Sequence, residues 1–246
     1  PGREAFRKYV PELKKEHNID VVVVNGENIA GGRGISRKTL DEIYRAGADI
    51  VTSGNHIWDQ KEIVSFIDDE PFLIRPANYP EGAPGKGYCI YPFKAKNIGV
   101  INVSGRTFMP PMDCPFQKVD EILKEIKNQC DIILVDIHAE ATSEKIAMGF
   151  YLDGKVTCVV GTHTHVQTAD NRILPKGTAY ISDLGMVGPY NSSLGINVNN
   201  AIDKFITCRP VRFEMAEGPN IFSAVVLELA EDNSVKSFER ILFNEE

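Results

Sequence analysis

The chain has 246 residues and a formal net charge of −7, with 34 acidic residues against 27 basic ones. This length fits one large domain or two small ones, and an apolar share of 43% is that of a folded chain rather than a disordered one. The acidic excess argues against binding to duplex nucleic acid, which needs a basic surface. No apolar run approaches the roughly 20 residues of a membrane-spanning helix, so no membrane contact is expected.

The cysteines indicate the compartment. There are five, none of them in a CxxC pair, and this fits a reducing environment better than a disulfide framework. We therefore expect a cytoplasmic protein with structural, unpaired thiols. The sequence leaves the oligomeric state open, and a homo-oligomer is one option.

The first part of the chain alternates predicted helices and strands. Apolar residues three or four apart predict a helix over Gly2–His17, and Pro11 either kinks this helix or starts its second half. The short β-branched run DVVVVN at 20–25 is typical of a parallel strand buried on both faces. The following expected elements are a glycine-rich loop Gly26–Ser36, a helix Arg37–Ala46 N-capped by Ser36, a strand Asp49–Thr52, and a helix Gln60–Ile67 capped by Asp59.

The second part continues this alternation after a loop at 75–87. Its expected elements are a hairpin of Tyr88–Phe93 and Asn97–Val103, helices Phe116–Asn128 and Thr142–Leu152, and strands Asp131–Ile137, Lys155–Val160 and Thr178–Ser182. Alternating apolar and polar residues predict three further strands in the tail, at 211–216, 222–230 and 235–243. We expect one α/β domain over residues 1–246 whose C-terminal third forms a second, more antiparallel sheet. An α/β domain with a small β subdomain is the alternative.

Metal-competent side chains follow four of the predicted strands. They are Glu27 and Asn28, then Asn55 and His56, then His138, and finally His163 and His165. In an open α/β sheet the ligand crevice lies at the carboxyl ends of the strands, so these residues should converge. Imidazole, carboxylate and amide oxygen without thiolate suit iron, manganese, zinc or cobalt. Glu27 has two oxygens that could bridge two ions, an arrangement suited to in-line displacement at phosphorus.

Each of these residues has a plainer explanation when it is taken singly. A lone histidine is usually a surface residue or a hydrogen-bonded core residue, and Gly54-Asn55 is a common turn dipeptide. Asp59 could orient His56, but a helix N-cap is its expected role. Arg75 and Arg106 could contact a phosphate or a base, and a structural role is equally compatible with their loop positions. The joint placement of the metal-competent residues at strand ends favours a metal site that hydrolyses a phosphoester.

Two of these blocks resemble the signature of the calcineurin-like metallophosphoesterases. GNH at 54–56 matches one motif, and GTHTH at 161–165 looks like the terminal histidine pair with a Thr inserted. The blocks NGEN (25–28), GNHIWD (54–59), RPAN (75–78), HAEATSEK (138–145) and THTHVQTADNRILP (162–175) resemble, more narrowly, the bacterial YmdB-like branch. The resemblance implies a four-layer α-β-β-α sandwich and a binuclear centre of divalent or mixed-valence ions, with iron first and manganese as the alternative. It also implies hydrolysis of 2′,3′-cyclic nucleotides to 3′-nucleotides.

The same resemblance implies a role for each site residue. Glu27 would bridge the metals. Asn28 and His165 would hold one ion, and Asn55, His138 and His163 the other. His56 would stay off the metals and protonate the leaving 2′ oxygen, with a metal-bridging hydroxide as the nucleophile. Glu27 stands where most metallophosphoesterases have Asp, a feature shared with the YmdB-like branch.

The family pattern also opens with a strand and an Asp-containing block that supplies one further ligand. No such block stands before Pro1, so we expect the first strand of the fold to be missing from this sequence. A metal cluster does not by itself set specificity. A phosphomonoesterase, another phosphodiesterase, or a regulatory metal-binding protein that acts through a partner are therefore the alternatives to a cyclic-nucleotide phosphodiesterase.

Overall fold

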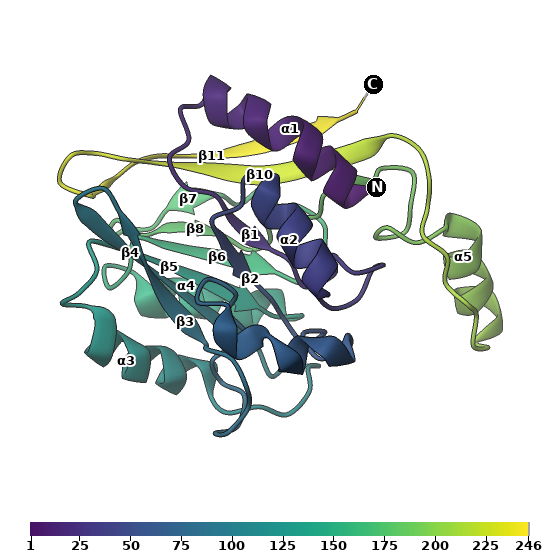
Figure 1. Ribbon diagram of the computed structural model, residues 1–246, viewed down its shortest axis with the longest axis horizontal. Coiled ribbons are helices and arrows are strands. Elements are labelled where there is room, and N and C mark those ends of the chain that lie inside the picture. Colours follow the sequence, from purple (N-terminus) through teal and green to yellow (C-terminus); the bar gives the residue numbers. More distant parts are fainter. Residues whose placement is uncertain (246) are drawn as a thin grey trace.

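The computed structural model describes residues 1–245, and its elements form four layers (Figure 1). One sheet has the order β3-β4-β5-β6-β8-β7, from Tyr88–Phe93, Lys96–Ser104, Ile132–His138, Cys158–Thr162, Ala179–Ile181 and Arg172–Ile173. The other strand layer contains the parallel pair β1 (Val23–Asn25) and β2 (Ile50–Thr52) and the sheet β11-β10-β9, from Val235–Asn244, Asn220–Leu229 and Gly188–Pro189. Helices α1 (Gly2–Glu16) and α2 (Arg37–Arg45) cover one outer face, and α3 (Pro115–Ile126) and α4 (Thr142–Leu152) cover the other. The predicted α-β-β-α sandwich is confirmed.

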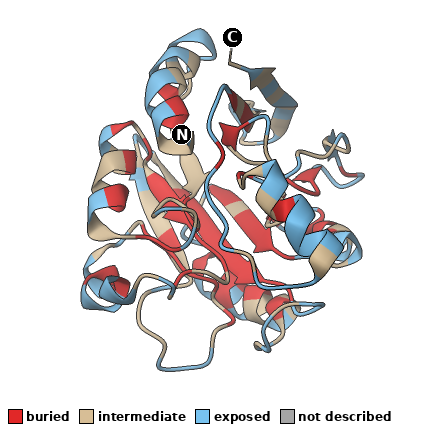
Figure 2. Ribbon diagram, turned by 90° about the vertical axis from the view of Figure 1, so that its right-hand side faces the viewer, coloured by how far each residue is buried: buried red, intermediate tan, exposed pale blue. Residues whose placement is uncertain are grey.

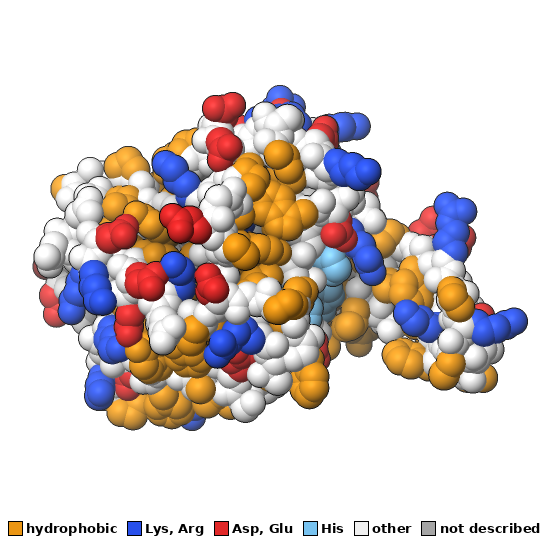
Figure 3. Space-filling view, turned by 90° about the horizontal axis from the view of Figure 1, so that it is seen from below, with side chains coloured by type: hydrophobic (Ala, Val, Ile, Leu, Met, Phe, Trp, Pro, Cys, Tyr) orange, Lys and Arg blue, Asp and Glu red, His pale blue; other side chains and the backbone are white. Residues whose placement is uncertain are grey.

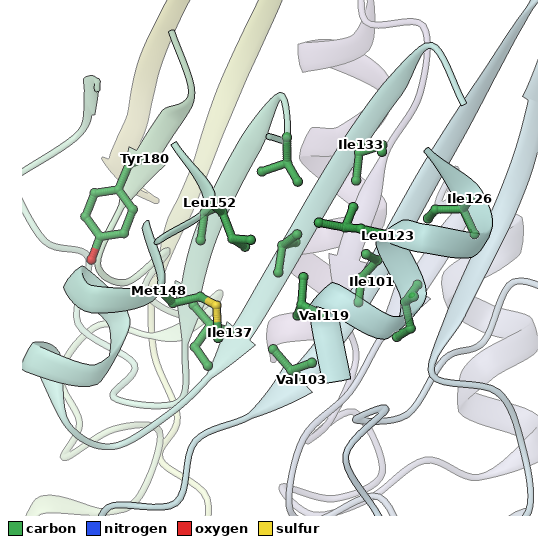
Figure 4. Close-up of a cluster of buried hydrophobic side chains, with 14 of the residues drawn as sticks. Ile101, Val103, Val119, Leu123, Ile126, Ile133, Ile137, Met148, Leu152 and Tyr180 are labelled. Atoms are coloured by element: carbon green, nitrogen blue, oxygen red, sulfur yellow. The ribbon is translucent and has the colours of Figure 1, made fainter. Parts of the chain in front are cut away.

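The apolar strands are explained by what packs on them. Within the six-stranded sheet, β4, β5, β6 and β8 run parallel, while β3 and β7 are antiparallel at its two edges. Val119 and Leu123 of α3 and Met148 of α4 pack on the outer face of this sheet (Figure 4). Its inner face packs on the second strand layer. Val100 of β4 and Ile50 of β2 belong to one buried cluster between the two layers. Because both faces are covered, most residues of the central strands are buried, as Figure 2 shows.

The register brings the carboxyl ends of the strands to one edge of the sandwich. Ser104 of β4 pairs with His138 of β5, and His138 pairs with Thr162 of β6. In the other layer, Asn25 at the end of β1 pairs with Thr52 at the end of β2. The loops that carry the predicted ligands therefore all leave from this edge.

Two strands end later than the sequence predicts. His138 and Thr162 are the last residues of β5 and β6, and they do not lie in the loops that follow. The strand expected from Lys155 begins only at Cys158. Lys155 and Val156 instead donate backbone N–H groups to the carbonyl of Leu152, which closes the turn after α4. His138 and Thr162, which precedes His163, therefore both lie within the hydrogen-bonded ladder of the sheet.

The predicted helix Gln60–Ile67, with Asp59 as its cap, is wrong. The segment forms two short 3-10 helices, Lys61–Ser65 and Ile67–Asp69. No side chain caps the first of them, because the carboxylate of Asp59 lies against the ring of His56 instead. Without a capped first turn, the segment keeps i→i+3 hydrogen bonds such as Phe66 N–H to the carbonyl of Ile63.

The tail differs from the prediction in one strand and one helix. The strands β10 and β11 are confirmed, but residues 211–216 form no sheet strand, and Met215 makes only an isolated bridge to Ile196. A helix that the sequence analysis did not predict, α5 (Val198–Thr207), projects from the body of the molecule (Figure 1). The sequence feature that could have predicted α5 is Asn197, whose side chain accepts a hydrogen bond from the backbone N–H of Asn199 as an N-cap. The short strands β7 and β9 were also not predicted.

None of the helices in residues 1–245 combines the length and the apolar composition that a membrane crossing requires.

Candidate metal centre

The predicted ligands meet at the shared strand edge, around the ring of His138. Nε2 of His138 lies 3.0 Å from Oε2 of Glu27, 3.0 Å from Oδ1 of Asn55 and 3.0 Å from Nδ1 of His163. These residues come from the loops after β1 and β2 and from the ends of β5 and β6. Figure 3 shows histidine side chains on the wall of the hollow between the body of the molecule and the projecting segment with α5.

The protons of the two rings can be assigned from their outer partners. The Thr162 hydroxyl donates to Oδ1 of Asp136 at 2.7 Å, so its oxygen accepts from Nδ1–H of His138 at 3.0 Å. In the neutral ring, this leaves a lone pair on Nε2 of His138. Nε2 of His163 lies 3.0 Å from Oε2 of Glu140, which places the proton of His163 on Nε2 and a lone pair on Nδ1.

This assignment makes the cluster electron-rich. The lone pair on Nε2 of His138 faces a carboxylate oxygen of Glu27, an amide oxygen of Asn55 and the lone pair on Nδ1 of His163. When His138 is neutral, no proton lies between these atoms, and they repel one another unless a cation lies among them. Two imidazoles with carboxylate and amide oxygens are a donor set that suits iron or manganese, and the residues present therefore fit a metal ion.

A second part of the site surrounds Asn28 and His165. Nδ2 of Asn28 lies 3.4 Å from Nε2 of His165. Oδ1 of Asn28 and Nδ1 of His165 are buried, and neither has a hydrogen-bond partner among the described residues. A buried polar atom without a partner costs about 1–3 kcal/mol, so these atoms also fit a site that a metal ion would complete.

His56 takes a separate position beside the cluster. Its backbone N–H donates to Oε1 of Glu27 at 2.8 Å, which fixes the second carboxylate oxygen. Its ring contacts Asp59, with Nδ1 at 3.0 Å from Oδ2 of the carboxylate. The ring is 28% exposed, so Nε2 remains the nitrogen that can meet a substrate. The expectation that Asp59 caps a helix is thus replaced by the alternative role of orienting His56.

Backbone geometry explains two motif positions. At Gly54 an added Cβ would lie 2.3 Å from Nε2 of His138, so only glycine leaves room for the ring. His163 and His165 adopt left-handed backbone angles, with φ of 102° and 66°. They therefore lie in a turn, where His163 meets His138 and His165 meets Asn28, rather than side by side on a strand.

The protonation states suit metal binding at neutral pH. Burial alone would raise the pKa of Glu27, but the positive charge of a protonated His138 ring and the N–H of His56 outweigh burial and lower it to about 2. A metal ion bound by the neutral ring would favour the ionised carboxylate in the same direction. Burial lowers the pKa of both His163 and His165, and His138 lowers that of His163 further. At neutral pH the site consequently presents Glu27 as a carboxylate and His163 and His165 as neutral imidazoles, the forms that ligate metals.

Sequence reasoning missed the residues behind the ligands. Asp136 is buried within β5, where it accepts hydrogen bonds from the hydroxyls of Thr52 and Thr162 and from Asn25. Burial raises its pKa, which these hydrogen bonds partly offset. A lone Asp inside the apolar run DIILVDI was the available signal.

Arg75 has a structural role. Its buried guanidinium donates to the carbonyls of Pro76, Ala83 and Pro84 at 2.8–2.9 Å, which fixes the loop at 75–87. It therefore does not reach toward a phosphate.

A four-layer sandwich with histidine, carboxylate and amide side chains at the shared strand edge is the architecture of the metallophosphoesterases. The chain belongs to one family within this class, since the model of the YmdB-like protein family matches residues 1–241. A 2′,3′-cyclic-nucleotide 2′-phosphodiesterase of Bacillus subtilis (strain 168) is 52% identical over all of this chain and 94% of its own length.

Two solved structures show the same fold. A hypothetical protein from Thermus thermophilus matches with a TM-score of 0.94 and 40% identity, over 100% of this chain and 95% of its own. A novel phosphatase from Mycoplasma pneumoniae matches with a TM-score of 0.93 and 35% identity, over 99% of this chain and 89% of its own. The family and the fold expected from the motifs are confirmed.

Proposed function

We propose that the protein is a metal-dependent phosphodiesterase that hydrolyses 2′,3′-cyclic nucleotides to 3′-nucleotides. The observation that carries this proposal is the set of metal-competent oxygen and nitrogen atoms around Nε2 of His138, each at 3.0 Å. The activity named for the Bacillus subtilis relative supports the substrate class, because half of its residues are identical to those of this chain. A small nucleotide would enter from the hollow beside α5 (Figure 3).

Two ions would be held by the residues of this edge. Asn55, His138 and His163 would ligate one ion, Asn28 and His165 the other, and Glu27 would bridge them. We propose iron first and manganese as the alternative, because no thiolate takes part. When bound, such a pair polarises the phosphoryl oxygens and lowers the pKa of the attacking water.

His56 would act as the general acid. Hydrolysis breaks the bond between phosphorus and the 2′ oxygen, and water supplies the new oxygen on phosphorus. The 2′ alkoxide is a poor leaving group and needs a proton, which Nε2 of His56 can deliver while Asp59 holds Nδ1. The hydrogen bond from the backbone N–H of His56 to Oε1 of Glu27 keeps the His56 ring close to the cluster.

We further propose that residues 1–246 act as one metallophosphoesterase domain in the cytoplasm. The absence of disulfides among the five cysteines supports a reducing compartment. Assembly into a homo-oligomer is compatible with the exposed apolar residues Phe205 and Ile206 of α5.

The test is turnover by protein loaded with Mn²⁺ or Fe²⁺, after metal content has been measured by mass spectrometry. We expect hydrolysis of 2′,3′-cyclic AMP to 3′-AMP. Chromatography that separates 2′-AMP from 3′-AMP identifies the product. Two bound ions without hydrolysis of this substrate or of bis-p-nitrophenyl phosphate would contradict an enzymatic role. Hydrolysis of p-nitrophenyl phosphate alone would favour a phosphomonoesterase.

His56→Ala tests the acid. We expect unchanged metal content, a loss of about 100-fold or more on 2′,3′-cyclic AMP, and a much smaller loss on bis-p-nitrophenyl phosphate, whose leaving group needs no proton. His17→Ala, at the end of α1, is the matched control. Equal losses on both substrates would rule out proton donation as the role of His56.

A further inference from the structure

The turn that carries His163 and His165 has an unfavourable backbone. Both residues have positive φ, at 102° and 66°, and Thr164 lies between them. Such angles cost non-glycine residues of the order of 1–3 kcal/mol each and persist only where the surroundings impose them. In this conformation the two rings reach different partners, His138 and Asn28, so the turn sets the separation of the two ligand positions.

Asp183 makes side-chain hydrogen bonds to the turn. Its Oδ2 accepts the backbone N–H of Thr164 at 3.0 Å and the Thr164 hydroxyl at 2.7 Å. Its Oδ1 accepts the backbone N–H of Gly185 at 2.8 Å. One carboxylate, 1% exposed, thus ties the histidine turn to the segment that follows β8.

Lys145 completes the arrangement from α4. Its Nζ lies 2.7 Å from Oδ2 of Asp183 and 3.4 Å from the Thr164 hydroxyl, and its side chain is also 1% exposed. The stem of Lys145 crosses Gly161, where an added Cβ would lie 2.9 Å from Cδ of the lysine. A buried ion pair adds little net stability, because its desolvation offsets its attraction. A role in fixing the histidine turn explains the pair better than a role in stability.

We propose that Lys145 and Asp183 are positioning residues that hold the Thr164 turn, and that they thereby enable His163 and His165 to serve two metal ions at once. This proposal rests on the proposed function for the use of those ions. Neither residue touches the ligands' ring atoms among the described contacts. Their effect passes through the backbone of Thr164.

The experiment compares Mn²⁺ binding by the wild-type protein and by the double variant Lys145→Met/Asp183→Leu. This variant leaves no unpaired charge buried, so we expect it to fold. Its unfolding midpoint should be lower than that of the wild type, because the backbone N–H groups of Thr164 and Gly185 lose their acceptor. We expect its Mn²⁺ affinity, measured by isothermal titration calorimetry, to fall about 10-fold to 100-fold. We also expect fewer ions per chain.

A milder pair of variants gives the same answer if the double variant fails to fold. Thr164→Val removes the hydroxyl that donates a hydrogen bond to Asp183, whereas Thr164→Ser keeps this hydroxyl. We expect weaker Mn²⁺ binding in the valine variant and wild-type binding in the serine variant. Equal affinity in both would overturn the proposal.

Asp153→Asn is the matched control. Asp153 is a buried carboxylate that follows α4 at its other end and accepts the N–H groups of Lys176 and Thr178. The Asp153→Asn variant should have a lower unfolding midpoint than the wild type and an unchanged Mn²⁺ affinity.

The outcomes separate the two proposals. Wild-type Mn²⁺ affinity in the folded double variant overturns the positioning role and leaves the proposed function intact. Two bound ions in the wild-type protein without turnover, together with weakened binding in the variants, overturn the function and leave the positioning role intact. A wild-type protein that binds no Mn²⁺ or Fe²⁺ overturns both.

Discussion

Oε2 of Glu27 lies 3.0 Å from Nε2 of His138, although one residue follows β1 and the other ends β5, in two different sheets. Both side chains are at most 2% exposed. The contact therefore forms only where the two strand layers pack together. The candidate metal centre is therefore formed by the packing of the two strand layers, and metal binding should depend on that packing.

Glu27→Gln tests the bridging role. The amide keeps the size of the side chain but removes the negative charge and one acceptor from the cluster, so we expect Mn²⁺ affinity to fall at least about 100-fold. Isothermal titration calorimetry measures the affinity, and Glu121→Gln on the exposed face of α3 is the control. Retention of two ions at wild-type affinity would remove Glu27 from the ligand set.

Gly54→Ala tests the space for the His138 ring. The new Cβ would lie 2.3 Å from Nε2 of His138, so the ring must shift away from Glu27 and Asn55. We expect a loss of about 1–3 kcal/mol in the free energy of unfolding, together with weaker metal binding. Urea unfolding and calorimetry measure the two effects. Gly188→Ala, where nothing lies within 4 Å of the added Cβ, should change neither.

Asp59→Asn tests the orientation of the acid. The carboxylate of Asp59 holds Nδ1 of His56 at 3.0 Å, and an amide can do so only more weakly. We expect kcat for 2′,3′-cyclic AMP to fall about 10-fold to 100-fold with unchanged metal content. Steady-state kinetics measures this, with Asp41→Asn on α2 as the control. Unchanged kcat would show that His56 needs no carboxylate partner.

Asp170→Asn gives a pH-dependent effect on stability. Burial alone would raise the pKa of Asp170, but hydrogen bonds from Ser182 and Thr168 outweigh burial and lower it. A lowered folded-state pKa means that the carboxylate stabilises the fold above its unfolded pKa of 3.8, and that this contribution is lost as the pH falls through the folded-state value. The wild-type protein should exceed the variant in unfolding free energy at pH 7, and the difference should shrink below pH 4. Urea unfolding across this range measures it, and a constant difference would contradict the prediction.

Local patterns predicted most elements because burial on both faces leaves a clear mark on a strand. The runs before Asn25, Thr52 and His138 are continuous and β-branched, and each forms a parallel strand. The failures lie where tertiary contacts compete with local signals. Asp59 looks like a cap in the sequence, yet His56 takes its carboxylate, and the expected helix becomes 3-10.

Alternation alone also proved insufficient at 211–216. This segment has the pattern of a strand, but its backbone hydrogen bonds to the loop at 195–197 are two single ones. Asn197 N–H donates to the carbonyl of Glu214, and Ala216 N–H donates to the carbonyl of Gly195. A strand needs a neighbouring strand of matching length to satisfy its backbone groups, and no local pattern supplies one.

The motifs of the sequence predicted the class of protein and the sandwich through their resemblance to a known family, and the buried strand patterns predicted most strands, because both kinds of signal are local properties of the chain. Only the tertiary structure decided which atoms face one another. The proton of His138 is fixed by Thr162 and Asp136, and the histidine turn is tied by Asp183 and Lys145. These contacts join residues that are distant along the chain, and they arise from the packing of two sheets and a helix. For the same reason, phosphate binding by this acidic chain would depend on cations held at the packed strand edge, as proposed, rather than on its net charge.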